Sequence, residues 1–149
     1  MGDPGQIGTR WVTYAGFWVR VGAALIDGFL LWPFLVGFDY LTFGDPFPPE
    51  PARITPAFAT SSLVAIAAHW LYSALMESSR RQATVGKMLL GLQVTDLEGN
   101  RISFGVATGR HFIDYLNALT LGLGYIMNVF TDKRQCFHDK VARTLVLEQ

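Results

Sequence analysis

Three ionisable side chains lie inside stretches of sequence that are otherwise almost wholly apolar. Arg20 and Asp27 belong to the run RVGAALIDGFLLWPFLVGF, where a spacing of seven places them on one helix face, within about 20° of each other. His69 belongs to the run AFATSSLVAIAAHWLYSALM. A carboxylate and an imidazole at one depth on neighbouring helices can share a proton, which is the chemistry of relays and coupled transport sites. The same two groups can instead satisfy each other and lock the two helices together.

The depths of Asp27 and His69 predict that these two side chains face each other. Asp27 lies about 10.5 Å along the helix from Arg20, and His69 lies about 12 Å from Glu77, the expected cytoplasmic end of its helix. An aspartate in a membrane helix costs about 2.5 to 3.5 kcal/mol on insertion scales, so it needs a partner. The alternative partners for Asp27 are Arg20, Tyr72, Ser73 and Arg110.

The composition of the chain is that of a small membrane protein. The chain has 149 residues, of which 50% are apolar and 16% are charged, and its mean hydropathy is +0.27. Residues 18–38 and 57–77 each approach the roughly 20 apolar residues that cross a bilayer. We therefore expect an all-α membrane protein, with an N-terminal tail at 1–16 and one membrane domain at 17–149.

A third apolar element, residues 105–131, is long enough to span a bilayer but is polar in its first half, where Arg110 and Asp114 lie. The glycines of TLGLG interrupt this element, so it can also bend back. Lysine and arginine in short loops collect on the cytoplasmic side, and basic residues both precede and follow the element. We therefore expect two full spans and a re-entrant or interfacial third element, with both termini cytoplasmic. Three full spans remain the alternative.

The segment after the second helix, residues 78–104, is not lipid-like and is expected in the cytoplasm. Thr84 can cap a short helix that ends at Gly91. The stretch SSRRQATVGK carries hydroxyl, amide and basic groups that suit an anion, but it lacks the GxxxxGK[ST] spacing of a nucleotide-binding loop. A role at lipid headgroups therefore fits this stretch better than nucleotide binding.

Two short stretches within 78–104 alternate in the manner of strands joined by a turn: LQVTD and LEGNRIS. Beyond the third element, the C-terminal segment 132–149 contains TLVLE, which can pair with LQVTD as an added strand. Such pairing would fasten the C-terminus to a small cytoplasmic β segment.

Other kinds of chemistry are poorly supported. Twelve basic and twelve acidic residues give a formal net charge of zero, so the chain lacks the overall electrostatic footprint of a nucleic-acid-binding protein. His138 and Asp139 are metal-ligand types, but neighbours on a helix point about 100° apart and no third ligand is evident. No serine, cysteine or threonine has a recognisable base beside it. We therefore expect no metal, no cofactor and no enzymatic activity.

Three separated motifs resemble those of the RDD family, small prokaryotic membrane proteins named for one arginine and two aspartates. The motifs are Arg20 with Asp27, QATVGKMLLGLQVTD, and RQCFHDKVARTLVL. The resemblance covers residues 17–147 and implies that Arg20, Asp27 and Asp139 are the residues of the name, with Asp114 as the alternative second aspartate. The residues of interest in the middle motif are Gln82, Thr84, Gly86, Lys87 and Gly91.

Two classes of function remain. The first is a small transporter or permease subunit, since transport has been proposed for some members of that family. Arg20, Asp27 and His69 would then surround a polar pocket for an ion or small solute, and a homo-oligomer or another membrane protein would be needed because two or three helices cannot enclose a pathway. The second is a non-catalytic scaffold whose buried polar residues specify helix packing and whose cytoplasmic segment docks another protein. His69, Arg110 and Asp114 are the possible intramembrane partners. Both classes place the chain in the lipid bilayer of a prokaryotic cell membrane.

Overall fold

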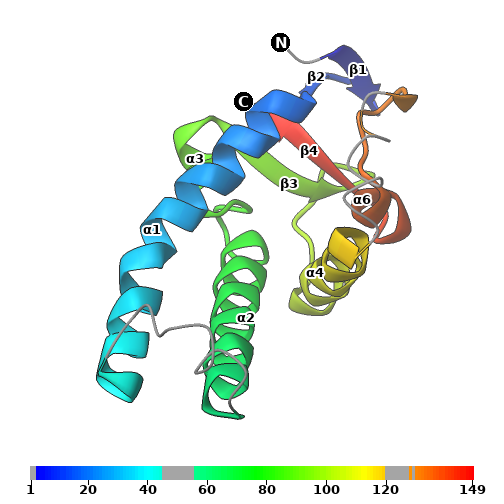
Figure 1. The fold of residues 1–149 in the computed structure, drawn as a ribbon. Coiled ribbons are helices and arrows are strands. Elements are labelled where there is room, and N and C mark those ends of the chain that lie inside the picture. Colours follow the sequence, from blue (N-terminus) through cyan, green and yellow to red (C-terminus); the bar gives the residue numbers. More distant parts are fainter. Residues whose placement is uncertain (1–2, 45–55, 120–127, 129) are drawn as a thin grey trace.

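The computed structural model describes residues 3–44, 56–119, 128 and 130–149. Two long helices extend from a small sheet-containing unit, and the labelled N- and C-termini both lie at the sheet (Figure 1). The far ends of the long helices point away from this unit. The sheet therefore occupies one end of an elongated molecule.

The two long helices, α1 (Phe17–Phe43) and α2 (Pro56–Glu77), lie where the sequence predicted apolar spans. Both are long and apolar enough to cross a membrane, which confirms that part of the prediction. Only 11% and 17% of their most apolar windows are buried, so these helices expose apolar side chains that the core helices of a soluble protein would cover. α1 ends where Gly44 adopts a left-handed conformation, with φ +72°, and donates its N–H to the carbonyl of Tyr40.

Four short strands form one antiparallel sheet in the order β1-β2-β4-β3. They are β1 (Asp3–Ile7), β2 (Arg10–Tyr14), β3 (Leu92–Asp96) and β4 (Thr144–Glu148). The pairing of β4 with β3 runs from Leu92 opposite Glu148 to Asp96 opposite Thr144. This register confirms the predicted pairing of TLVLE with LQVTD. Because β4 is a central strand, its first four residues are buried.

Three sequence predictions are wrong in this part of the chain. The all-α class is corrected by the sheet, and residues 1–16 are not a simple tail, because β1 and β2 form a hairpin across Gly8, whose φ is +59°. The strand predicted in LEGNRIS is absent. Instead, the Asp96 carboxylate accepts the N–H groups of Glu98 and Asn100 at 3.0 and 2.7 Å, and these local bonds close a turn.

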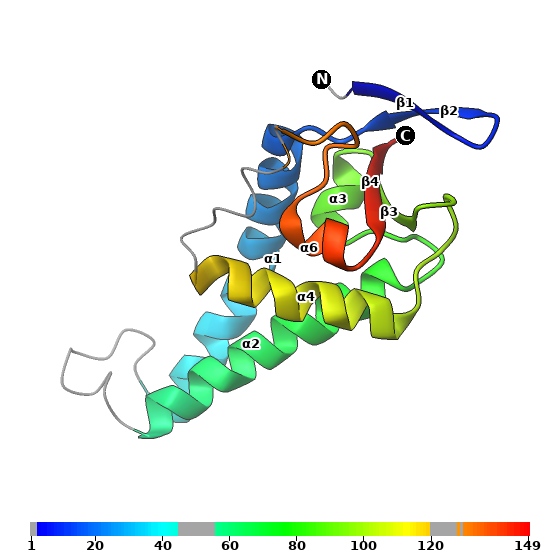
Figure 2. The same ribbon diagram turned by 90° about the vertical axis from the view of Figure 1, so that its right-hand side faces the viewer.

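Helix α4 (Phe104–Leu119) covers the first part of the third apolar element. Residues 120–127 and 129, which include TLGLG, lie outside the described residues. α4 is seen nearly end-on in Figure 1, where α1 runs down the page, and lengthwise in Figure 2, so it lies across the direction of α1. Its sixteen residues correspond to about 24 Å, less than the roughly 30 Å of hydrocarbon in a bilayer.

Two short helices, α3 (Val85–Leu89) and α6 (Phe137–Val141), lie between the long helices and the sheet (Figure 2). The main core cluster combines apolar sheet residues with alanines of the helices. It includes Leu92, Val94, Val146, Ala23, Ala74 and Ala107. Alanines of α1, α2 and α4 therefore share one buried core with the apolar residues of the sheet.

Candidate functional site

Most of the ionisable residues that the helices bring to the sheet end gather into one network, called the charge cluster here. It consists of Arg20, Glu77, Lys87, Arg110, His111, Asp114, His138 and Asp139. Each of the helices α1, α2, α3, α4 and α6 contributes at least one member. The cluster therefore joins segments that are far apart in the sequence.

Asp139 is one of two fully buried carboxylates in the cluster. The guanidinium of Arg20 donates to Oδ2 of Asp139, and Nε of Arg110 donates to Oδ1 at 2.8 Å. The N–H of Cys136 also donates to Oδ2, at 3.2 Å, so Asp139 caps its own short helix. One carboxylate on α6 thus links the first turn of α1 to the middle of α4.

Glu77 is the second buried carboxylate, at the last residue of α2. Nη1 of Arg110 donates to its Oε2 at 2.6 Å, and the ammonium of Lys87 donates to its Oε1. His111 Nε2 lies 3.6 Å from the same Oε2. Arg110 therefore bridges the two carboxylates of the cluster with different nitrogen atoms, the fork geometry for which arginine is suited.

The electrostatics of the cluster keep the carboxylate of Asp139 ionised. Burial alone would raise the pKa of Asp139, but the guanidinium groups of Arg110 and Arg20 outweigh it and hold this pKa well below 3.8. The two buried carboxylates, Asp139 and Glu77, therefore face three cationic side chains of the cluster: Arg20, Lys87 and Arg110. Such a network is stable only while every partner is present, because each unpaired charge would remain desolvated.

Within the charge cluster, His138 lies between Asp139 and Asp114 of α4. Its Nδ1 lies 3.0 Å from Oδ1 of Asp114, and its Nε2 lies 3.3 Å from Oδ1 of Asp139. Burial alone would lower the pKa of His138, but the carboxylates of Asp139 and Asp114 outweigh it and raise this pKa above the ordinary 6.5. The protonated imidazole is therefore favoured between the two carboxylates.

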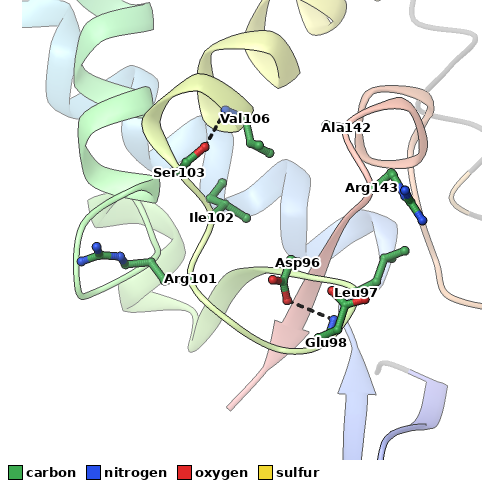
Figure 3. Close-up of a pocket in the computed structure, with 9 residues that line it drawn as sticks. All are labelled: Asp96, Leu97, Glu98, Arg101, Ile102, Ser103, Val106, Ala142 and Arg143. Atoms are coloured by element: carbon green, nitrogen blue, oxygen red, sulfur yellow. Dashed lines mark hydrogen bonds between the residues drawn. The ribbon is translucent and has the colours of Figure 1, made fainter.

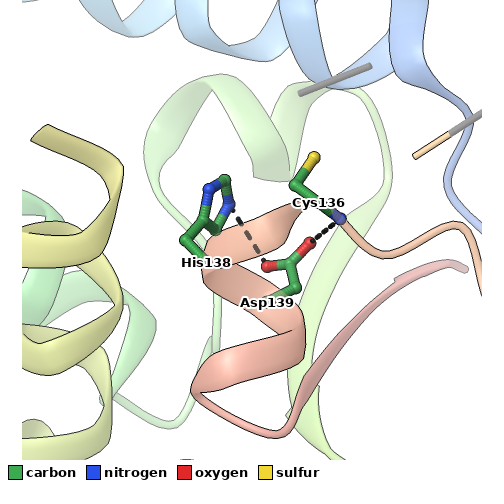
Figure 4. A group of neighbouring side chains, drawn as sticks. All are labelled: Cys136, His138 and Asp139. Atoms are coloured by element: carbon green, nitrogen blue, oxygen red, sulfur yellow. Dashed lines mark hydrogen bonds and ion pairs between the residues drawn. The ribbon is translucent and has the colours of Figure 1, made fainter. Parts of the chain in front are cut away.

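Cys136, His138 and Asp139 together offer a sulfur, a nitrogen and an oxygen within 4.8 Å of one another (Figure 4). The sequence argument that the His–Asp pair lacks a third ligand is therefore wrong, since Cys136 supplies one. Both Asp139 oxygens, however, already accept guanidinium donors. Burial and the Asp139 carboxylate also raise the pKa of the Cys136 thiol to about 11, so it stays protonated. These contacts favour an ion-pair network over a metal site.

Asp27 lies outside the charge cluster and is bound by three donors. Tyr72 donates its hydroxyl to Oδ1 at 2.8 Å, the Thr84 hydroxyl donates to Oδ2 at 2.5 Å, and the N–H of Gly86 donates to Oδ1 at 2.8 Å. The predicted pairing of Asp27 with His69 is therefore wrong, and Tyr72 is the correct partner among the alternatives. Matching depth does not fix which helix face a side chain occupies, and α3 supplies donors that the sequence argument did not consider.

The middle motif places its residues around Asp27 and the sheet. Thr84 occupies the N-cap position of α3 as predicted, but its hydroxyl binds Asp27 and does not cap the helix. A Cβ at Gly86 would overlap the carbonyl oxygen of Ala23 and lie 2.9 Å from Cγ of Asp27, so only glycine fits there. Gly91, with φ +66°, follows α3 in agreement with the prediction.

The remaining two residues of that motif also have structural contacts. Gln82 donates its side-chain amide to the carbonyl of Val94 at 3.0 Å, which ties the α2–α3 connection to β3. Lys87 is the ammonium partner of Glu77 described above. The motif therefore fastens α3 to α1, to α2 and to the sheet.

His69 belongs to a contact between α2 and α4. Its Nδ1 lies 3.4 Å from the hydroxyl of Tyr115, which donates to the carbonyl of Ile66 at 3.2 Å. The His69 ring also meets the His111 ring edge to face, with centroids 6.3 Å apart. A series of titratable groups thus leads from His69 through His111 to Glu77.

A hollow of about 350 Å³ lies between the β3–α4 connection and the end of α6 (Figure 3). It is lined by Asp96, Leu97, Glu98, Arg101, Ile102, Ser103, Val106, Ala142 and Arg143. The guanidinium groups of Arg101 and Arg143 point to opposite sides of the hollow in Figure 3, and Asp96 is turned to the backbone of Glu98. Its charged groups do not converge on a common point, so this hollow is a weaker candidate site than the charge cluster.

The structure separates the residues that the sequence grouped together. Arg20 pairs with Asp139, whereas Asp27 binds Tyr72, Thr84 and Gly86, and Asp114 pairs with His138. Sequence reasoning missed Glu77 as a site residue, because it was used only to mark the end of a helix. One signal was available: Glu77 is the single carboxylate between Pro56 and Thr95 and is followed by basic residues.

Two membrane-length helices fastened at one end to a sheet by buried ion pairs define a class of small helical protein with a polar, sheet-bearing end. Residues 14–143 match the RDD family, and the chain belongs to this family. The chain is 32% identical over 146 residues to YxaI, an uncharacterized protein of Bacillus subtilis (strain 168), covering 89% of this chain and 96% of the relative. It is also 32% identical over 147 residues to the uncharacterized membrane protein YteJ of the same organism, covering 91% and 82%. No solved structure matches the chain.

Proposed function

We propose that the protein is a non-catalytic membrane scaffold, anchored in the bilayer by α1 and α2 and holding its sheet at the cytoplasmic surface. The observation that carries this proposal is the mutual satisfaction of the buried charges. Arg20, Arg110 and Lys87 are bound to Asp139 and Glu77, and Asp27 accepts three hydrogen bonds. Groups engaged in this way hold helices in place and do not bind a passing solute.

The arrangement of the termini supports a two-span topology. β2 and β4 are neighbours in one sheet, so the N- and C-terminal strands belong to the same side of the membrane. The exposed arginines Arg80 and Arg81 follow α2 at this end of the molecule. Because basic residues in short connections favour the cytoplasm, we assign the sheet and both termini to the cytoplasmic side.

The scaffold is proposed to act by assembly with a second copy or with another membrane protein. The substitution Asp27→Leu tests this directly. It removes a carboxylate that opposes insertion by about 2.5 to 3.5 kcal/mol, but it leaves Tyr72, Thr84 and the Gly86 N–H without an acceptor. We expect insertion equal to or better than that of the wild type, and a loss of the defined oligomer in mild detergent, measured by light scattering.

Phe29→Leu is the matched control, because Phe29 lies on the same helix with its side chain exposed. It should leave both insertion and assembly unchanged. Poorer insertion of Asp27→Leu, or an unchanged oligomer, would contradict the scaffold.

Ion-coupled transport is a second candidate, favoured by the series His69, His111 and Glu77 between α2 and α4. A subunit that moves protons would acidify proteoliposomes loaded with a pH-sensitive dye, and His69→Phe would abolish this change. If the protein is a scaffold, the dye signals of the wild type and of His69→Phe should both equal the signal of protein-free vesicles. The same reconstituted sample thus separates the two functions.

A further inference from the structure

The polarity of α4 is the reverse of that expected for a helix at a protein surface. Its ionisable side chains within residues 104–116 turn inward, where Arg110 and His111 meet Glu77, and Asp114 meets His138. Its outward side chains are apolar: Phe112 is 57% exposed and Leu116 is 62% exposed. A helix lying on a membrane surface would instead turn its charges to water.

Contacts with α2 place α4 beside the candidate span and not beyond its end. The hydroxyl of Tyr115 donates to the carbonyl of Ile66, which lies eleven residues, or about 16 Å, before Glu77. The Trp70 ring meets the rings of Phe104 and Phe112, with centroids 6.2 and 6.1 Å apart. α4 therefore lies alongside the part of α2 that precedes its cytoplasmic end.

We propose that α4 is submerged in the cytoplasmic leaflet, with Phe112 and Leu116 in contact with lipid acyl chains. This inference rests on the proposed function in one respect, namely that α2 spans the bilayer. Given that placement, the outer face of α4 continues the exposed apolar surface of α2, to which Ile66 and Leu71 belong. The connection between β3 and α4, by contrast, carries exposed charges such as Glu98 and Arg101.

The inward charges of α4 explain how such a helix tolerates lipid. An unpaired arginine or aspartate in the acyl region is unfavourable, but Arg110 is bound to Glu77 and Asp139, and Asp114 to His138. The charge cluster thus neutralises α4 on its protein side, and the apolar side chains cover it on the other. A helix of sixteen residues lying across α1 can occupy one leaflet without crossing the membrane.

Nitroxide labels at single cysteines test this placement. Phe112→Cys and Leu116→Cys are each made in a Cys136→Ser background, labelled, and reconstituted into vesicles of phosphatidylethanolamine and phosphatidylglycerol. Collision rates are measured by electron paramagnetic resonance with oxygen, which concentrates in lipid, and with a water-soluble nickel chelate. Phe29→Cys on α1 is the lipid control, and Glu98→Cys in the turn after β3 is the water control.

Labels at 112 and 116 should collide with oxygen as often as the label at 29 and lose their nickel collisions to the same extent. If the labels at 112 and 116 collide with the nickel chelate as often as the label at 98, this face of α4 lies in water and the proposal is overturned. If these labels collide rarely with both reagents, a protein partner or a second copy covers this face, and the proposal is also overturned. If the label at 29 is itself accessible to nickel, the membrane anchoring proposed above fails. If the label at 29 behaves as expected and only the labels at 112 and 116 do not, the placement of α4 in the leaflet is wrong and the membrane anchoring stands.

Discussion

Replacing Asp139 by asparagine tests whether the charge cluster holds the helices together. The substitution keeps the shape of the side chain and removes one charge from a fully buried position. Arg20 and Arg110 both donate to this carboxylate, so two guanidinium groups lose an anionic partner at once. Breaking one side of a buried ion pair destabilises a protein by about 3 to 5 kcal/mol, because the remaining charge stays desolvated.

Two features of the structure place the expected loss near the lower limit of that range. Arg110 retains its bond to Glu77 at 2.6 Å, and the amide oxygen of asparagine can still accept one hydrogen bond. Arg20 also keeps its hydrogen bond to the carbonyl oxygen of Arg134, at 2.7 Å. We therefore expect the free energy of unfolding to fall by about 3 kcal/mol. The assay is equilibrium unfolding by dodecyl sulfate in mixed micelles, followed by far-UV circular dichroism.

Asp132→Asn is the matched control, because it makes the same chemical change at an exposed aspartate on the same segment. Its effect should stay within about 0.5 kcal/mol, as for most surface substitutions. The double variant Arg20→Gln with Asp139→Asn should recover part of the loss, since it also removes an unpaired cation. A loss below about 1 kcal/mol for Asp139→Asn, indistinguishable from that of the control, would refute the role given to the cluster.

Two further predictions concern the middle motif and the response to pH. Gly86→Ala forces a Cβ against the Ala23 carbonyl and should destabilise the protein by about 1 to 3 kcal/mol in the same assay, whereas Gly105→Ala, which meets nothing closer than 3.9 Å, should be neutral or stabilising. Equal effects of the two would contradict the close approach of α3 to α1. The raised pKa of His138 means that its contribution to stability is complete below 6.5 and is lost as pH rises through the raised value. The free energy of unfolding should therefore fall as the pH rises above 6.5 in the wild type and change less in His138→Gln, and parallel pH profiles would disprove the contribution.

Hydropathy and alternation sufficed to predict the elements that depend on local pattern. α1 and α2 follow from long apolar runs, and β3 and β4 follow from short alternating ones. The hairpin of β1 and β2 carried a weaker signal, the two-residue connection Gly8-Thr9, in which glycine tolerates the positive φ that such turns need.

The partners of the charged residues were harder to predict, because they are set by tertiary structure. Helical spacing gives the depth of Asp27, but its partner depends on α3, which reaches α1 only because Gly86 lacks a side chain. Arg20 and Asp139 are 119 positions apart, so their meeting depends on how α1, α4 and α6 pack together. Residue type predicted that these groups need partners, and the fold determined which partners they have.

The position of β4 in the sheet has a consequence for the biosynthesis of the protein. Arg20 leaves the ribosome 119 residues ahead of its partner Asp139, and β4 follows later still. At roughly 5 to 20 residues per second, Arg20 therefore waits about 6 to 24 s for the carboxylate that neutralises it. During this interval α1 enters the membrane with an uncompensated cation at its end, while β2 and β3 present unpaired edges until β4 fills the gap between them. The sheet of the nascent chain therefore stays incomplete until β4 has left the ribosome.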